Sequence, residues 1–265
     1  MAGFAYTTGA QDFERRRALP TDAAAAIRTV VLADLDATPR PRVLDLGAGT
    51  GRIGWPFVAA DDDYVGVDLS PAMLRVFTER RELAPARVPL LIRADGENLP
   101  FGEASFDAVL LMQVLNAAHD WRRLLLEARR VLRPSGSLIV GRTVAPEHGV
   151  DTRMKRRLGE FLGALGAQPY AGHAVDDALA MLRRAARRER TVTVASWRSD
   201  RTPRHFLERH AAGARFSALP APVRDAAMHQ LHDWAASAFG SLDVACTEPS
   251  GFELTIFHLE PGRLH

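Results

Sequence analysis

The chain has 265 residues, of which 47% are hydrophobic and 25% are charged, a composition typical of a soluble globular protein. A single cysteine, Cys246, excludes an intramolecular disulfide and a zinc site built from thiolates, and it fits a reducing, cytoplasmic setting. The net charge of +2 is too slight to indicate a nucleic-acid partner. No segment is long and apolar enough for a secretory signal or a membrane span, so we expect a soluble, cytoplasmic protein without a membrane partner.

The N-terminal region predicts a helix over residues 12–36, where Ile27 and Val31 lie on one apolar face and Pro39 ends the pattern. Strands and helices then alternate. Continuous apolar runs predict strands at 42–46, 64–69, 88–95, 106–115 and 135–142, and helices at 51–60, 70–83 and 120–132 separate most of them. Such alternation favours a parallel sheet covered by helices on both faces.

Two prolines mark helices in this region. Ser70 followed by Pro71 is a strong start signal for the helix 70–83. Pro56 lies inside the expected helix 51–60, where we expect it to cost a hydrogen bond or bend the helix.

Beyond Arg142 the pattern is less regular. We expect helices at 150–167, 174–190, 202–220 and 221–239, and strands at 191–197 and 251–260. No internal repeat or linker is visible, so the sequence favours one domain with helical insertions over two domains.

The stretch RVLDLGAGTGRIG combines a strand, an acid at Asp45 and glycines at Gly47, Gly49 and Gly51. Bare backbone between a strand and a helix lets a ligand approach closely, and helix N-termini offer unpaired N–H groups. The dinucleotide pattern would need a glycine where Arg52 stands, and a P-loop would need a lysine. An acid-x-G-x-G-x-G pattern remains.

Four segments in order, VLDLGAGTGR (43–52), VGVDLSPAML (65–74), RADGENLPF (93–101) and the run 106–142, resemble the class I S-adenosylmethionine-dependent methyltransferases. The last of these is similar to the small-molecule branch of that family, which includes the type 11-like methyltransferases. The resemblance implies a Rossmann-like, doubly wound α/β fold with a seven-stranded, mostly parallel sheet whose last strand is antiparallel. It also implies one methyltransferase domain over 1–265, comprising an N-terminal helical cap (1–40), a cofactor-binding core (41–142), and acceptor lid helices with the last strands (143–265).

The same resemblance assigns S-adenosylmethionine as the cofactor. Its adenosine is expected over Asp68, Leu69 and Met73, with Asp68 on the ribose. Its methionine part is expected over Gly47, Ala48 and Gly49, with Asp45 orienting the amino group. The adenine is expected beside Ala94, Asp95 and Gly96, and the sulfonium beside Met112 and Gln113.

Simpler structural roles stay open for several of these residues. Gly47 and Gly49 could only form a tight turn, and Asp95 could form a turn beside Gly96. Asp68 could cap a helix, although Ser70 already fits that position. Met73 and Met112 could only fill the core.

Other candidates lie outside the four segments. His119 could act as a general base or could simply be an exposed residue before a helix. Tyr6, Arg15 and Arg16 could touch the cofactor carboxylate or form an exposed N-terminal face. We expect a solvated face for His229 and His232, and likewise for the basic stripe Arg183, Arg184, Arg187 and Arg188; no metal site is expected.

The expected reaction is an in-line displacement at the sulfonium methyl, in which alignment supplies much of the rate. A base is needed only when the acceptor carries a proton. The aromatic and apolar residues after Arg142 could line an acceptor pocket or form the core of the insertions: Phe161, Leu165, Tyr170, Trp197, Phe206, Phe216 and Trp234. We expect a small-molecule acceptor; an RNA or protein methyltransferase and a non-catalytic S-adenosylmethionine-binding scaffold are the alternatives.

Overall fold

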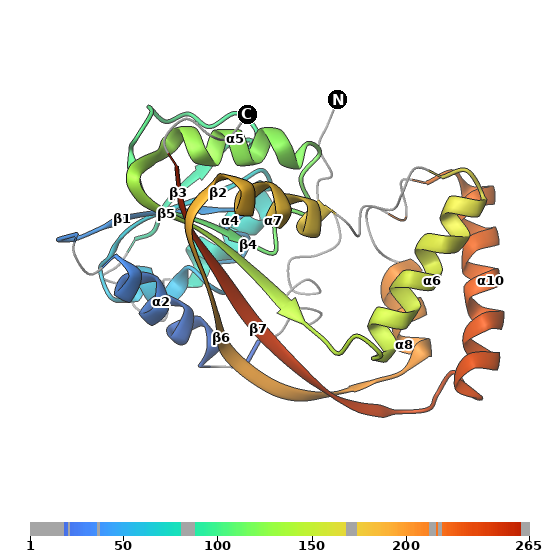
Figure 1. Ribbon diagram of the computed structural model, residues 1–265. Helices are drawn as coiled ribbons and strands as arrows, with labels where there is room; N and C mark the ends of the chain where they lie inside the picture. Colours follow the sequence, from blue (N-terminus) through green and yellow to red (C-terminus); the bar gives the residue numbers. More distant parts are fainter. Residues whose placement is uncertain are drawn as a thin grey trace. The chain divides into compact units, whose positions relative to one another are not determined.

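The structure is a computed structural model, shown in Figure 1. It describes residues 19–20, 22–35, 38–80, 88–167, 174–211, 216 and 219–260. The chain forms two units: the first comprises Met1–Arg142, Ala174–Ala195 and Phe252–His265, and the second comprises Thr143–His173 and Ser196–Gly251.

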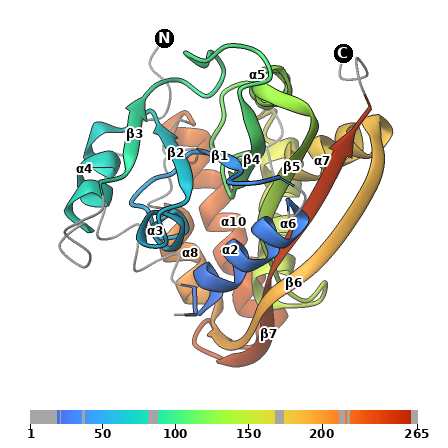
Figure 2. The same ribbon diagram turned by 90° about the vertical axis from the view of Figure 1, so that its left-hand side faces the viewer.

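In the described part of the chain, seven strands form one sheet in the order β3-β2-β1-β4-β5-β7-β6. The strands are β1 (Arg42–Leu46), β2 (Asp63–Asp68), β3 (Leu90–Arg93), β4 (Phe106–Met112), β5 (Leu132–Val144), β6 (Ala186–Arg201) and β7 (Cys246–Leu259). The first five pair in parallel, β7 runs opposite to β5 in Figure 1, and β3 and β6 lie at opposite edges in Figure 2. The predicted doubly wound, mostly parallel sheet is therefore confirmed.

Helices cover both faces of this sheet. One face packs against α5 (Trp121–Val131) and α7 (Ala174–Ala185), whose buried leucines join the strands in one apolar cluster. The other face carries Tyr64, which stacks on Phe57 of α3 (Trp55–Ala59) and meets Phe77 of α4 (Pro71–Glu79) edge-on. The central strand β4 is buried along its whole length, as its continuous apolar sequence predicts.

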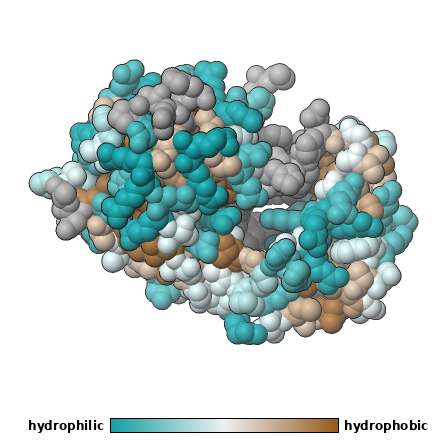
Figure 3. Space-filling model, in the orientation of Figure 1, coloured by the Kyte–Doolittle hydropathy of each residue, from teal (hydrophilic) through white to brown (hydrophobic). Residues whose placement is uncertain are grey.

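The N-terminal helix is α2 (Ala23–Asp34), which buries Ile27 and Val31; the earlier part of the expected helix 12–36 lies outside the described residues. Figure 3 shows many hydrophilic residues on the visible face of the first unit, and Arg183, Arg184, Arg187 and Arg188 are exposed as expected.

The second unit contains α6 (Val150–Ala164), α8 (Pro203–Ala211) and α10 (Ala221–Phe239). Phe206 and Phe216 are fully buried in its core, and Phe161, Leu165 and Trp234 pack against that core. These side chains therefore form the interior of the unit, one of the two roles expected for them. Trp197 is half-buried on β6, and Tyr170 lies outside the described residues.

Two sequence expectations are wrong. The helix expected at 51–60 is only Trp55–Ala59, so Pro56 occupies the first turn, where its missing N–H breaks no helical bond. The helix expected at 174–190 ends at Ala185, and Ala186 to Arg190 begin β6 instead. Pairing of β6 beside β7 in the sheet overrides the local helical preference of this arginine-rich segment.

Other elements differ mainly in length. β5, β6 and β7 are all longer than the strands expected at 135–142, 191–197 and 251–260. The helix expected at 202–220 is described only as Pro203–Ala211, and α10 begins at Ala221 as expected. No helix among the described residues is long and apolar enough to cross a membrane.

Substitution of Gly51 tests how tightly the turn after β1 is packed. Its φ is +78°, and an added Cβ would overlap the ring of the buried Phe77. We expect Gly51→Ala to lower the free energy of unfolding by about 2 kcal/mol or more, because left-handed strain and overpacking add. Gly102→Ala, where a Cβ meets Ser105 at an ordinary 3.6 Å, is the control and should cost under about 1 kcal/mol in urea unfolding. Equal losses in the two variants would contradict this packing.

Candidate functional site

A pocket in the first unit lies at the carboxyl ends of β1, β2 and β4. The strand order reverses between β1 and β4, and open α/β sheets bind ligands at such switch points. Every candidate cofactor residue lines this one pocket, together with His119: Asp45, Gly47, Ala48, Gly49, Asp68, Leu69, Met73, Ala94, Asp95, Gly96, Met112 and Gln113.

Sequence reasoning missed part of the lining. Ser70, Thr50 and Glu97 are neighbours of candidate residues, so the motifs already pointed toward them. In the sequence, Arg52 is notable only because it stands where the dinucleotide pattern needs a glycine. Val114 was expected inside a strand, but β4 ends at Met112 and the chain turns along the pocket wall instead. The complete set not anticipated is Leu46, Thr50, Arg52, Ile53, Val67, Ser70, Glu97, Val114, Ala117, Ala118 and Leu124.

The glycine turn packs its backbone against the neighbouring strand. The N–H groups of Gly47 and Ala48 donate to the carbonyl oxygen of Val67 on β2, at 2.8 and 2.9 Å. Gly47 has a φ of +77°, and an added Cβ would lie 2.7 Å from Cγ2 of Val114. Glycine is therefore required here by backbone conformation and by the close approach of the loop after β4.

Asp68 at the end of β2 is fixed by two backbone donors. Its Oδ2 accepts from the N–H of Gly49 at 2.9 Å, and its Oδ1 accepts from the N–H of Ser70 at 2.8 Å. Ser70 in turn caps α4 by accepting from the N–H of Met73, as its sequence position predicts. Burial raises the pKa of Asp68, and the two backbone bonds oppose that rise. Each carboxylate oxygen has a second lone pair, so Asp68 can also accept from a diol.

Asp45 is a buried acid with one unused oxygen. Its Oδ2 accepts from the Tyr64 hydroxyl at 2.8 Å, while Oδ1 has no partner among the described residues. Burial raises the pKa of Asp45 to about 7; the Tyr64 bond lowers it and the charge of Asp68 adds to the rise. A buried carboxylate with an unpaired oxygen fits a ligand ammonium group, which would supply both a charge and a donor.

The loop that follows β3 forms another wall of the pocket. Asp95 Oδ1 accepts from the N–H of Glu97 at 2.9 Å, so the turn-forming role considered for Asp95 is present. Glu97 Oε1 accepts from the N–H of Asp120, and Arg123 Nε donates to the carbonyl of Glu97. Asp120 caps α5 through the N–H groups of Arg122 and Arg123, so this wall is joined to the start of that helix.

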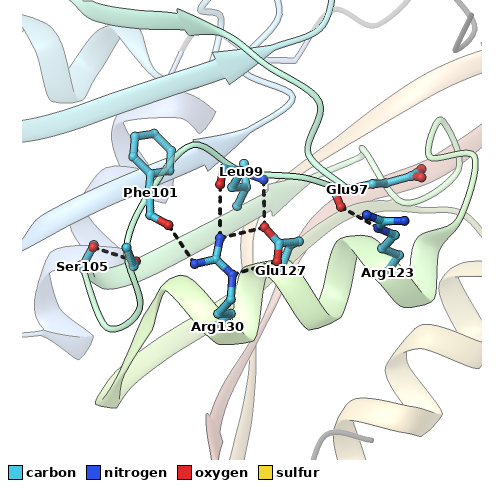
Figure 4. Close-up of polar contacts among 8 residues, drawn as sticks. Glu97, Leu99, Phe101, Ser105, Arg123, Glu127 and Arg130 are labelled. Atoms are coloured by element: carbon cyan, nitrogen blue, oxygen red, sulfur yellow. Dashed lines mark hydrogen bonds and ion pairs between the residues drawn. The ribbon is translucent and has the colours of Figure 1, made fainter.

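Arg130 of α5 donates hydrogen bonds to the same loop (Figure 4). Its guanidinium donates to the carbonyls of Phe101 at 2.7 Å and Leu99 at 3.1 Å, and to both carboxylate oxygens of Glu127. Glu127 also accepts from the N–H of Leu99 at 2.8 Å, and its bonds to Arg130 lower its pKa. This network holds the stretch after Gly96 against α5.

Met112 ends β4, Gln113 follows it, and both line the pocket. Met112 is buried, and Gln113 has a φ of +60°. Its Oε1 accepts from Nη2 of Arg52 at 3.2 Å. His119 is exposed on the pocket rim, and its role stays a prediction.

The remaining candidates lie elsewhere. His229 and His232 are exposed on α10, each beside Asp233, on the solvated face that was expected. Tyr6, Arg15 and Arg16 lie outside the described residues.

Comparison with known proteins shows what part of the chain is similar to a known family. Residues 44–140 match the model of a methyltransferase domain. Demethylmenaquinone methyltransferase of Renibacterium salmoninarum is 36% identical over 122 residues, covering 46% of this chain and 49% of that protein. That of Thermobifida fusca is 36% identical over 113 residues, covering 43% and 48%. The chain therefore spans about half the length of the curated relatives it matches.

Solved structures agree on the fold. The YcgJ protein of Bacillus subtilis superposes with a TM-score of 0.53 at 20% identity, covering 87% of this chain and 98% of that chain. A protein of Bacillus halodurans C-125 gives 0.55 at 16%, covering 91% and 100%. Residues 44–140 are thus similar to a methyltransferase domain, and the chain has the fold of the two superposed structures. S-adenosylmethionine is the cofactor that the resemblance implies, and the unpaired oxygen of Asp45 and the bare turn at Gly47 fit its amino-acid part.

The Arg130 network can be tested by stability. Arg130→Ala leaves two carbonyls and a carboxylate without their shared donor, so we expect a loss of about 2 kcal/mol in the free energy of unfolding. Arg129→Ala is the matched control, because within the described part of the chain this neighbouring arginine donates to a single carbonyl, that of Leu132, at 3.3 Å. Chemical unfolding of both variants measures the difference, and a smaller loss for Arg130 than for Arg129 would contradict the network.

The raised pKa of Asp45 predicts pH-dependent cofactor binding. A ligand ammonium binds the ionised carboxylate, so affinity should be full above pH 7 and fall as Asp45 gains a proton below it. We expect the Kd of S-adenosylmethionine to rise close to tenfold from about pH 7.5 to about pH 6. Asp45→Asn should bind more weakly and with little pH dependence. If calorimetry shows the same change of Kd with pH in the wild type and in Asp45→Asn, another group titrates.

Proposed function

We propose that the protein is an S-adenosylmethionine-dependent methyltransferase that transfers the methyl group to a small-molecule acceptor. The observation that carries this proposal is the single pocket in which the buried, half-paired Asp45, the glycine turn and Asp68 come together. Asp68 would bind the ribose hydroxyls, Asp45 the amino group, and the loop held by Arg130 would lie along the adenine.

The cofactor supplies an activated sulfonium methyl, so the chain's own residues have mainly to bind and align. Met112 and Gln113 would flank the sulfur from the end of β4. Fixed backbone donors and a buried strand end give this part of the site little freedom to move, which favours alignment as the source of rate. His119 is the candidate base for an acceptor whose nucleophile carries a proton.

Two features support a small acceptor. The curated relatives that match the cofactor-binding half are named for a quinone acceptor, demethylmenaquinone. The end of β4 reads LMQVLN and lacks the Asn-Pro-Pro-aromatic pattern typical of methylation at exocyclic base amines. The family model matches residues 44–140, and the covering role expected for residues 143–265 stays a prediction.

Transfer of labelled methyl tests this function. The protein is incubated with S-adenosylmethionine labelled in the methyl group and with small molecules that carry O, N, S or carbon nucleophiles, including a demethylated naphthoquinone, and separately with RNA and protein. We expect label in a small molecule, and we expect His119→Ala to lower kcat about a hundredfold for a protonated acceptor without changing cofactor binding.

Other outcomes distinguish the alternatives. Label in RNA or protein alone would favour a macromolecular acceptor, and the salt dependence of binding would then be steep for RNA. Tight cofactor binding without turnover on any acceptor would favour a non-catalytic binding scaffold.

A further inference from the structure

Arg52 gives the pocket a positive charge that the family motif does not require. Among the described residues that line the pocket, Arg52 is the only arginine, and none is a lysine. The acids that line the same pocket are Asp45, Asp68, Asp95 and Glu97. A guanidinium can bind an anionic group of a ligand, whereas the carboxylates suit its cationic and hydroxyl groups.

Gln113 accepts a hydrogen bond from this guanidinium, and its own backbone is in a strained conformation. A φ of +60° is uncommon for a residue other than glycine, and Gln113 is fixed there by its N–H bond to the carbonyl of Gly141 at 2.9 Å. From this position its Oε1 accepts from Nη2 of Arg52 at 3.2 Å. Strain that persists in a ligand pocket points to a functional use of the side chain it orients.

The position of Arg52 relative to Asp45 restricts which anion it meets. Asp45 lies two residues before Gly47, Arg52 directly follows Gly51, and both line the pocket. In the methionine part of S-adenosylmethionine the ammonium and the carboxylate are bonded to the same carbon. Partners at the two ends of one turn therefore suit these two groups.

We propose, on the basis of the proposed function, that Arg52 binds the methionine carboxylate of the cofactor and that Gln113 positions the Arg52 guanidinium for it. A guanidinium has five donors in a planar fork, which matches a carboxylate. The pair thereby selects the intact amino acid over a cofactor analogue that lacks the carboxylate. Nothing in the methyltransferase motif assigns this role to either side chain.

The test compares S-adenosylmethionine with decarboxylated S-adenosylmethionine, which differs only by the carboxylate, in calorimetric titrations of the full chain. Wild type should prefer the intact cofactor at least tenfold. Arg52→Ala should weaken binding of the intact cofactor at least tenfold and leave the decarboxylated form unchanged or tighter, so the preference disappears. Arg52→Lys should retain part of it, because the charge stays and the fork is lost.

Two further variants separate positioning from folding. Gln113→Gly relieves the left-handed strain, so its melting temperature should be unchanged or higher while the preference for the carboxylate falls several-fold. Arg75→Ala removes an exposed charge on α4 and should change neither ligand.

Three results would overturn the proposal. An equal loss of affinity for both ligands in Arg52→Ala would show that Arg52 has a general structural role. An unchanged preference in Arg52→Ala, with loss of preference in Arg15→Ala or Arg16→Ala, would assign the carboxylate to the N-terminal segment. Absence of any binding of S-adenosylmethionine to wild type would overturn the proposed function itself, whereas the first two results would leave it standing.

Discussion

The site depends on one constraint, which is the close approach of bare backbone to the end of β2. Gly47 and Ala48 donate to Val67, and Gly49 donates to Asp68, so the turn after β1 is bound to the neighbouring strand by three backbone N–H groups. The absent side chain at Gly47 makes room for Val114 from the loop after β4. Three strand ends thus meet around one turn, and the remaining walls of the pocket are arranged around it.

Burial of acids beside this turn gives the site its chemistry. Burial and the nearby charge of Asp68 both disfavour ionisation of Asp45, and among the described residues Asp45 has only the Tyr64 hydroxyl as a side-chain partner. Such an arrangement is costly in the ligand-free protein, because a buried carboxylate lacks both water and a counter-charge. A ligand that brings an ammonium group and hydroxyl donors offsets this cost, which links the electrostatics of the fold to the class of ligand it binds.

Residues 42–142 could be predicted well because their strands are continuous apolar runs, each closed by a turn or a capping residue. Ser70 and Asp120 are both found capping the helices that follow them. The start of β6 could not be predicted, since Arg187, Arg188 and Arg190 are exposed on an edge strand and show no apolar alternation. Only pairing within the sheet, which is not local in sequence, makes this segment a strand.

The site shows the same division. Asp45, Gly47, Gly49 and Asp68 belong to short motifs and could be found by spacing. Val114 and Ala118 could not, because they enter the pocket only once β4 ends at Met112 and the chain turns. The Arg52–Gln113 contact joins residues 61 positions apart, and the left-handed backbone of Gln113 that permits it has no sequence signal.

The most direct measurement is a calorimetric titration of the wild-type chain and of Asp68→Ala with S-adenosylmethionine, with NADH as the control ligand. We expect saturable binding at micromolar concentration to the wild type and no binding of NADH. In the variant we expect affinity to fall at least about tenfold, since two ribose hydroxyls lose a charged acceptor. Absence of binding, or equal affinity in the wild type and Asp68→Ala, would contradict the assignment of this pocket to the cofactor.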